Sequence, residues 1–241
     1  MSSPTRLPRT SEGLIGVILV FFLLAATPPP HVVIVGGHAS HDYDRWFDQE
    51  SRLILQEMVS AITYTDEPGQ LKSLLSDADL LYLSNNQPLP GDALRELIFD
   101  YVYEGNGLLL VHAALWYNWS DWPEYNRFFA GGGSASHPPF GSFEVVLTDI
   151  DHPVTADLPD SFIIHDELYR FVPDAQNPPM VVLAEATEHE TGVTYPVVWT
   201  MQYGQGRIVC ITLGHDGQAH THPAFRRLVQ NSILWLNSTE P

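Results

Sequence analysis

Short, fully apolar runs alternate with helical segments through the first half of this chain, and this alternation constrains its fold most strongly. Residues 31–35, 61–65, 80–83 and 108–111 are rich in valine, leucine and isoleucine, as buried strands are. Residues 45–60, 70–75 and 90–103 carry apolar positions near helical spacing, with Pro90 near one helix start and Gly105 past its end. Strands that alternate with helices predict βαβ units and a parallel sheet.

The pattern changes in the second half of the chain. Residues 113–140 are long, aromatic and glycine-rich, which is typical of a functional or partly helical connection. Strands are predicted over residues 143–147, 161–164, 180–184, 193–200 and 207–213, several of them alternating as in an antiparallel extension, and a closing helix over 223–236. The sequence therefore predicts one α/β domain over residues 31–241, a flavodoxin-like three-layer sandwich with a mainly parallel sheet and an antiparallel extension.

Histidines follow three of the predicted strands. His38 and His41 come after the first strand, His112 ends the run 108–111, and His215 follows the run 207–213. The carboxyl ends of parallel strands meet at one edge of an open sheet, and ligands bind at that edge. We therefore expect these histidines to converge on one crevice.

His112 stands at a predicted strand-to-helix turn, where α/β enzymes place an exposed catalytic side chain. The small residues Ala113 and Ala114 follow it and permit tight packing. The alternative is a core histidine bonded to the backbone.

Further candidates lie in three loops. His137 ends a glycine- and serine-rich segment that requires unusual backbone angles. Glu167, in the sequence His-Asp-Glu-Leu-Tyr that begins at His165, is a candidate general acid, base or metal ligand, unless that segment is a solvated loop. Asp216 follows His215 directly and is suited to orient it or to share a metal with it.

These residues give two chemical interpretations. Neutral imidazoles with a carboxylate suit a divalent metal such as zinc, with His41, His112, His215 and Asp216 as predicted ligands. His112, His137 and Glu167 are the predicted catalytic residues, and without a metal they form an acid–base set. Other interpretations are structural: His220 and His222 as loop or helix-start residues, and Cys210, the one cysteine, as a buried apolar residue of a strand.

The charge of the chain restricts its partners. The formal net charge is -18 and Lys72 is the only lysine, whereas nucleic-acid binding needs clustered cations. Nucleic acid and anionic membrane surfaces are therefore excluded as expected partners, and a small neutral or cationic ligand fits better.

The N-terminus resembles a targeting segment. Arg6 and Arg9 precede the apolar residues 14–26, and residues 27–30 then break the run. This arrangement predicts that residues 1–30 are a signal peptide, and hence a secreted or periplasmic protein. The alternative is an uncleaved membrane anchor.

Six segments give the chain a family resemblance: residues 107–114, 131–137, 151–154, 166–169, 196–199 and 203–216. In this order they are similar to the trehalose-utilisation, or ThuA-like, family, over about residues 32–236. The resemblance implies a class I glutamine amidotransferase-like fold and a link to sugars or their keto derivatives. True amidotransferases carry a cysteine at the turn that His112 occupies, so glutamine hydrolysis is not expected.

The sequence thus predicts an exported enzyme acting on a sugar or keto-sugar, as a lyase, isomerase or hydrolase. A second hypothesis is a carbohydrate-binding domain without catalysis, in which Trp116, Tyr117, Trp119 and Trp122 stack on sugar rings. A third is an assembly domain, and a homo-oligomer is compatible with each of them. Fold alone does not decide among these functions.

Overall fold

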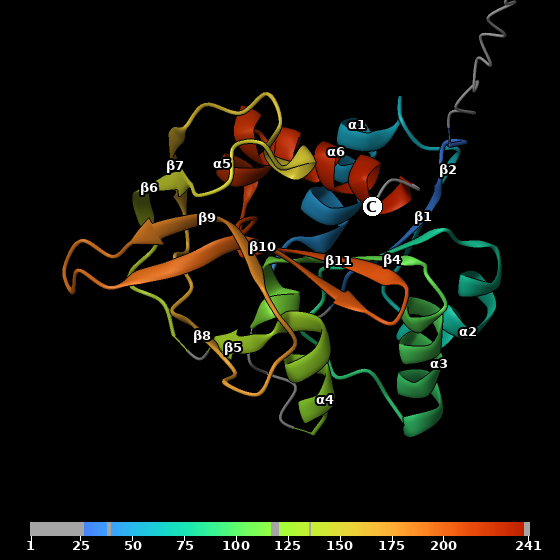
Figure 1. The fold of residues 1–241 in the computed structure, drawn as a ribbon. Coiled ribbons are helices and arrows are strands. Elements are labelled where there is room, and N and C mark those ends of the chain that lie inside the picture. The colour runs from blue at the N-terminus through green and yellow to red at the C-terminus, as the bar shows by residue number, and fades with distance from the viewer. Residues whose placement is uncertain (1–26, 38–39, 117–120, 135, 239–241) are drawn as a thin grey trace, which may run out of the picture.

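The computed structural model describes residues 27–37, 40–116, 121–134 and 136–238, which are organised around one large sheet (Figure 1). The strands lie in the order β2-β1-β3-β4-β11-β10-β9-β6-β7. Their bounds are β1 (His31–Val35), β2 (Ala61–Thr65), β3 (Leu80–Leu83), β4 (Gly107–Val111), β6 (Gly141–Leu147), β7 (Ser161–Asp166), β9 (Val181–Thr187), β10 (Thr194–Tyr203) and β11 (Gly206–Ile211). A second, small sheet pairs β5 (Gly132–Ser134) with β8 (Phe171–Pro173).

The sheet has a parallel half and an antiparallel half. Strands β2, β1, β3, β4 and β11 are mutually parallel. Helices cover both faces of this half, so β3 and β4 are buried along their whole length, which explains their continuous apolar sequences. Strands β10, β9, β6 and β7 then continue the sheet in antiparallel register. The predicted α/β class, with its parallel sheet and antiparallel extension, is confirmed.

Two hydrophobic cores lie on opposite faces of the sheet, which makes the molecule three-layered. Alternate residues of β1 divide between them, with Val32 and Ile34 on one face and Val33 and Val35 on the other. The first core holds α1 (Ser51–Leu55), α5 (Gly217–His220) and α6 (Pro223–Asn237), and the second holds α2 (Leu71–Leu74) and α3 (Asp92–Tyr103). The short α4 (Pro123–Tyr125) also contributes to the second core.

Two details differ from the sequence prediction. The helix expected over residues 45–60 is a π-helical segment, Asp44–Glu50, followed by α1, which ends at Leu55. It ends early because the chain must turn into β2, and the N–H of Ser60 donates a hydrogen bond to the carbonyl of Pro30. Strands β5 and β8 were not predicted, because Gly132 and Gly133 have no side chains to show an alternation.

The N-terminal prediction lies outside this description, since residues 1–26 are not among the described residues. In the part of the chain that is described, no helix has the length and apolar character needed to cross a bilayer.

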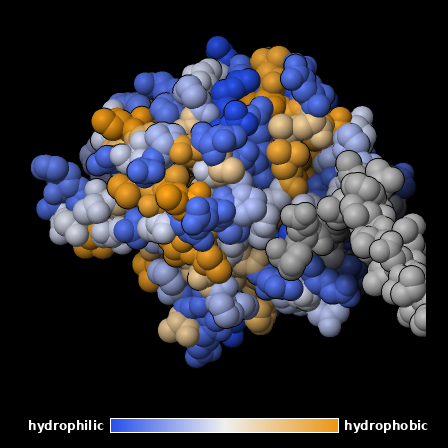
Figure 2. All heavy atoms as spheres, turned by 45° about the horizontal axis from the view of Figure 1, so that its top comes forward, coloured by the Kyte–Doolittle hydropathy of each residue, from blue (hydrophilic) through white to orange (hydrophobic). Residues whose placement is uncertain are grey.

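Figure 2 shows one face of the molecule as a mixture of hydrophilic and hydrophobic patches. Large exposed apolar side chains include Val146 on β6 and Ile163 on the edge strand β7, and such scattered exposure is ordinary for a folded protein.

Gly206 offers a test of the packing around β11. A Cβ at this position would overlap the carbonyl oxygen of Val102 and lie 2.7 Å from that of Asn106. Gly206→Ala is therefore expected to lower the free energy of unfolding by about 1–3 kcal/mol, measured by urea denaturation. The control is Gly69→Ala, where a Cβ meets nothing within 4 Å. Equal stability of the two variants would contradict the close packing at Gly206.

Candidate functional site

A strained turn presents His112 at the carboxyl end of β4. The backbone of His112 has a φ of 49°, in the left-handed region that non-glycine residues rarely adopt. Its side chain is fully buried, and the small residues Ala113 and Ala114 let the following turn pack closely. Strain of this kind is found at functional sites, where the surrounding structure holds it in place.

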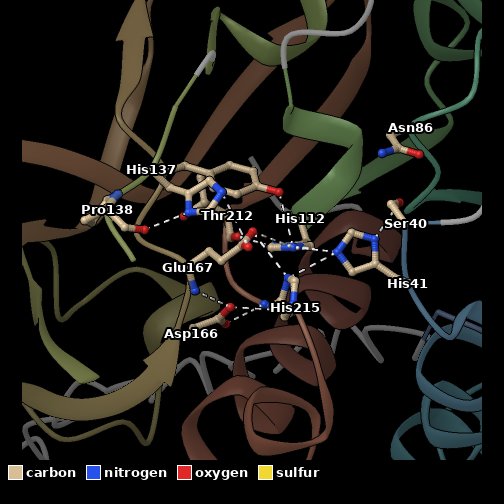
Figure 3. A network of polar contacts seen from close by, with 12 residues as sticks. Ser40, His41, Asn86, His112, His137, Pro138, Asp166, Glu167, Thr212 and His215 are labelled. Atoms are coloured by element: carbon tan, nitrogen blue, oxygen red, sulfur yellow. Dashed lines mark hydrogen bonds and ion pairs between the residues drawn. The ribbon is translucent and has the colours of Figure 1, made fainter. Parts of the chain in front are cut away.

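The structure brings together histidines from three distant loops (Figure 3). The Nε2 atom of His41 lies 3.1 Å from Nε2 of His112 and 3.3 Å from Nδ1 of His215. These loops follow β1, β4 and β11, which are parallel strands of one sheet. One nitrogen from each histidine lies within 4.8 Å of the others, which is close enough to share a metal ion. His38, the other candidate of the first loop, lies outside the described residues.

Glu167 supplies a carboxylate to the same point. Its Oε2 atom lies 3.3 Å from Nδ1 of His215 and 3.6 Å from Nε2 of His112. Zinc with four ligand bonds of about 2.0–2.1 Å holds its ligand atoms roughly 3.3 Å apart. The two His41 distances are close to this value, so the three histidines are spaced to share a metal ion, and the Glu167 carboxylate lies beside them.

The protonation of His112 suits this role. Its Nδ1 lies 2.8 Å from the carbonyl oxygen of Thr212, which can only accept a hydrogen bond, so Nδ1 carries the proton and Nε2 keeps its lone pair. Burial lowers the pKa of His112 well below its usual value. Burial, with the charge of His215, also lowers the pKa of His41 to about 4. Both imidazoles are therefore neutral at pH 7, as metal ligands must be.

His137 meets the other oxygen of the carboxylate. Its Nε2 lies 3.5 Å from Oε1 of Glu167, and its Nδ1 donates to the carbonyl of Pro138 at 2.7 Å. Burial acts to raise the pKa of Glu167, but the hydrogen bond from His215 and the nearby histidine charges lower it overall. The carboxylate is thus ionised at neutral pH and links the three-histidine cluster to His137.

The buried carboxylate of Asp166 fixes the backbone segments that carry Glu167 and His215. This buried carboxylate accepts backbone N–H bonds from Gly214 at 2.7 Å, from Glu167 at 2.8 Å and from His215 at 3.1 Å. Burial raises its pKa to about 7, although the three hydrogen bonds act in the opposite direction. Asp166 therefore ties the end of β7 to the turn that follows β11, and so fixes Glu167 relative to His215.

Asp216, a predicted metal ligand, has a different role in the structure. It is the N-cap residue of α5, and its carboxylate accepts the N–H of Gln218 at 2.8 Å. Short acceptor side chains of this type stabilise the first turn of a helix. The carboxylate that faces the three histidines comes instead from Glu167.

The two later histidines differ from each other. His222 caps the start of α6 with its Nδ1, as a helix-start residue would. His220, interpreted from sequence in the same way, is fully buried at the end of α5 and packs against Phe47 and Phe225. Its Nε2 donates to the carbonyl of Gly214 at 3.0 Å, so it supports the turn that carries His215.

A cavity of about 240 Å³ opens above the cluster. Its lining residues come from loops that follow several strands: Ser40, His41, Asn86, Trp116, His137, Glu167, Tyr169 and His215. The ring of Trp116 forms one wall beside the rings of His137 and Tyr169. Trp122 is 4% exposed and packs in the second core instead, and Tyr117 and Trp119 lie outside the described residues.

Sequence reasoning missed Ser40, Asn86 and Tyr169 as residues of the site. The hydroxyl of Tyr169 lies 3.2 Å from Nε2 of His112, and its ring packs against the same imidazole. Asn86 follows β3 and Tyr169 follows β7, so position after a strand was the available signal. Serine, asparagine and tyrosine are common in loops, and residue type alone does not separate them from their neighbours.

The fold and this site define an α/β protein with a glutamine amidotransferase-like fold, with His112 at the turn that follows β4. The model of the family ThuA, described as trehalose utilisation, matches residues 31–236, so the chain belongs to the ThuA family. No curated protein matched the chain.

Solved structures share the fold. A ThuA-like protein from Parabacteroides merdae is 22% identical, with a TM-score of 0.75 and coverage of 88% of this chain and 92% of its own. One from Bacteroides uniformis is 20% identical, with a TM-score of 0.73 and coverage of 92% and 95%. A β-galactosidase from Bacillus circulans is 13% identical, with a TM-score of 0.56, and the match covers 83% of this chain and 30% of that enzyme.

His220 predicts an acid-sensitive fold. Burial lowers its pKa from 6.5 to about 4. Between these pH values the unfolded chain binds a proton that the folded chain does not, so the free energy of unfolding falls as the pH drops, by about 3 kcal/mol for this group. His220→Gln keeps a donor for Gly214 and should flatten the stability profile between pH 6.5 and 4, measured by urea denaturation. The exposed His189→Gln is the control, and equal slopes in both variants would contradict the assignment.

Proposed function

We propose that this ThuA-family protein is an exported enzyme that acts on a sugar or keto-sugar with the help of a divalent metal ion, zinc in the first place. His41, His112 and His215 would hold the metal, with the Glu167 carboxylate beside it and one position left open to substrate. The observation that carries the proposal is that one nitrogen of each histidine lies within 4.8 Å of the others, beneath an open cavity. A bound divalent ion would supply Lewis-acid polarisation of a carbonyl or hydroxyl oxygen.

The electrostatics of the cluster support a cation. The Nε2 atoms of His41 and His112 face one another at 3.1 Å, and the lone pair of His112 points into that contact. A neutral His41 can satisfy this contact with an Nε2–H, or, with its proton on Nδ1, it can share a metal ion with His112. The lowered pKa values of both imidazoles keep them neutral, as metal ligands must be.

His137 and Tyr169 are the proposed groups for handling protons and substrate. His137 lines the cavity with its side chain 31% exposed, and its Nε2 faces the carboxylate of Glu167, so it can exchange a proton with a bound ligand. The buried hydroxyl of Tyr169 borders the same cavity, where it can donate a hydrogen bond to a substrate oxygen. Trp116 offers an aromatic wall of the kind on which sugar rings stack.

The rest of the chain fits this proposal. The single cysteine, Cys210, is buried within β11 and donates to the carbonyl of Phe129, so it is not placed as the nucleophile of a glutamine amidotransferase. The strongly acidic composition supports a small uncharged or cationic ligand rather than nucleic acid. The signal-like N-terminal segment supports export, to the periplasm or out of the cell.

Metal content tests the central claim. Purified protein, loaded with zinc and freed of excess, is expected to hold about one ion per chain by plasma mass spectrometry. His112→Ala and His215→Ala each remove one ligand, and both should lose most of the bound ion. His189→Ala, an exposed histidine in the β9–β10 turn, serves as the matched control and should keep it.

Retention of the ion by both ligand variants, or an ion-free wild-type protein under the same loading, would contradict the metal centre. Circular dichroism of each variant separates loss of a ligand from loss of the fold. Without a metal, the same histidines and Glu167 would remain as an acid–base site.

A second candidate function is carbohydrate binding without catalysis, which Trp116 in the cavity wall favours. Trp116→Ala should weaken binding of mono- and disaccharides at least tenfold, measured by calorimetry. Glu167→Gln should abolish turnover of keto-sugars or simple glycosides if the protein is an enzyme. Sugar binding with no turnover by the metal-loaded wild-type protein would favour the binding function over the enzyme.

A further inference from the structure

A chain of hydrogen bonds runs away from the metal-facing histidines toward the rim of the cavity. Nδ1 of His41 lies 2.8 Å from Oγ of Ser40, and this oxygen lies 3.1 Å from the hydroxyl of Tyr43. The Tyr43 hydroxyl donates in turn to the side-chain oxygen of Asn86 at 3.3 Å. The chain thus links a loop after β1 to a loop after β3, and Asn86 also lines the cavity.

The hydrogen bonds in this series have one donor-to-acceptor direction. The amide oxygen of Asn86 can only accept, so Tyr43 uses its single proton on that contact. The Tyr43 oxygen must then accept from Ser40, and Ser40, having used its own proton, must accept from Nδ1 of His41. Followed back to its origin, the chain places the proton of the neutral His41 imidazole on Nδ1 and leaves the lone pair on Nε2.

We propose that Ser40, Tyr43 and Asn86 are positioning residues that fix the Nδ1–H tautomer of His41 and so make its Nε2 a metal ligand. Nε2 is the atom that faces His112 and His215. The other tautomer would place a hydrogen on Nε2, pointing into the cluster, and would exclude a metal ion. The inference rests on the metal centre of the proposed function.

A parallel case in the same site supports this assignment. The carbonyl of Thr212 fixes the Nδ1–H tautomer of His112 in one step, through the backbone. In the described part of the chain, the ring of His41 contacts the side chains of Ser40, His112 and His215, and a three-residue relay takes the place of a carbonyl. Partners of this type orient metal-bound histidines and raise their basicity, and their loss typically weakens metal binding 10- to 100-fold.

Tyr43 is the best position for a test, because it is buried and its ring packs against Phe47 and His41. Tyr43→Phe keeps the ring and removes only the hydroxyl that joins Ser40 to Asn86. The variant is expected to bind zinc about 10- to 100-fold more weakly than the wild type, measured by competition with a chromophoric chelator. Tyr101→Phe is the matched control. Tyr101 is a buried tyrosine of α3 whose hydroxyl donates to the carbonyl of Ala78, and this variant should bind zinc as the wild type does.

The tautomer itself can be observed without any metal. Long-range ¹⁵N–¹H correlation spectra of the metal-free protein at pH 7.5 should show His41 with its proton on Nδ1 in the wild type and in Tyr101→Phe. Tyr43→Phe and Ser40→Ala should show a mixture of tautomers. Asn86→Asp keeps an acceptor for Tyr43 and should keep the single tautomer, a rescue that a merely structural role would not produce.

The outcomes separate the two proposals. If the wild-type protein binds no zinc, the proposed metal centre fails, and the spectra still decide the tautomer of His41. An Nε2–H tautomer in the wild type, or zinc affinity in Tyr43→Phe equal to that of Tyr101→Phe, would overturn the relay.

Discussion

The geometry of the site depends on the three backbone N–H groups that converge on Asp166. The antiparallel half of the sheet runs away from β11 through β10, β9 and β6, and its edge strand β7 could have ended far from the histidines. The bonds from Gly214, His215 and Glu167 to the buried Asp166 carboxylate bring that edge back to the turn after β11. A buried carboxylate is costly unless such donors satisfy it, so this closure and the position of Glu167 stabilise each other.

The parallel half of the fold could be predicted because each of its strands leaves a local signal in the sequence. A buried parallel strand needs a continuous apolar run, and the residue after each run must lie at one edge of the sheet. That reasoning placed the loops of His41, His112 and His215 at the same edge of the sheet. In the structure, one nitrogen of each of these histidines lies within 4.8 Å of the others. It could not select Glu167 over Asp216 as the facing carboxylate. That choice depends on the curl of the antiparallel half, and on the helix cap that engages Asp216, and neither leaves a periodic signal in the sequence.

Sequence patterns also do not show which nitrogen of a histidine carries the proton. A histidine is a ligand through one nitrogen only when a partner holds the proton on the other. For His112 that partner is the backbone of Thr212, which any residue at position 212 could provide. For His41 it is a relay through Ser40 and Tyr43, whose members lie one and two residues away in the chain but end at Asn86, far along it. Only the packed structure shows that these groups form one chain.

The strained turn at His112 connects the fold to its proposed chemistry. In α/β enzymes, a strand-to-helix turn of this kind can present a nucleophile, which must be reachable by substrate. Here the turn presents an imidazole that is fully buried and whose two nitrogens face Thr212 on one side and the His41–Glu167 cluster on the other. A buried, neutral, singly oriented imidazole cannot attack a substrate, but it is well suited to bind a metal ion at the floor of a cavity. The strain at φ 49° is thus better explained by ligand positioning than by nucleophilic catalysis.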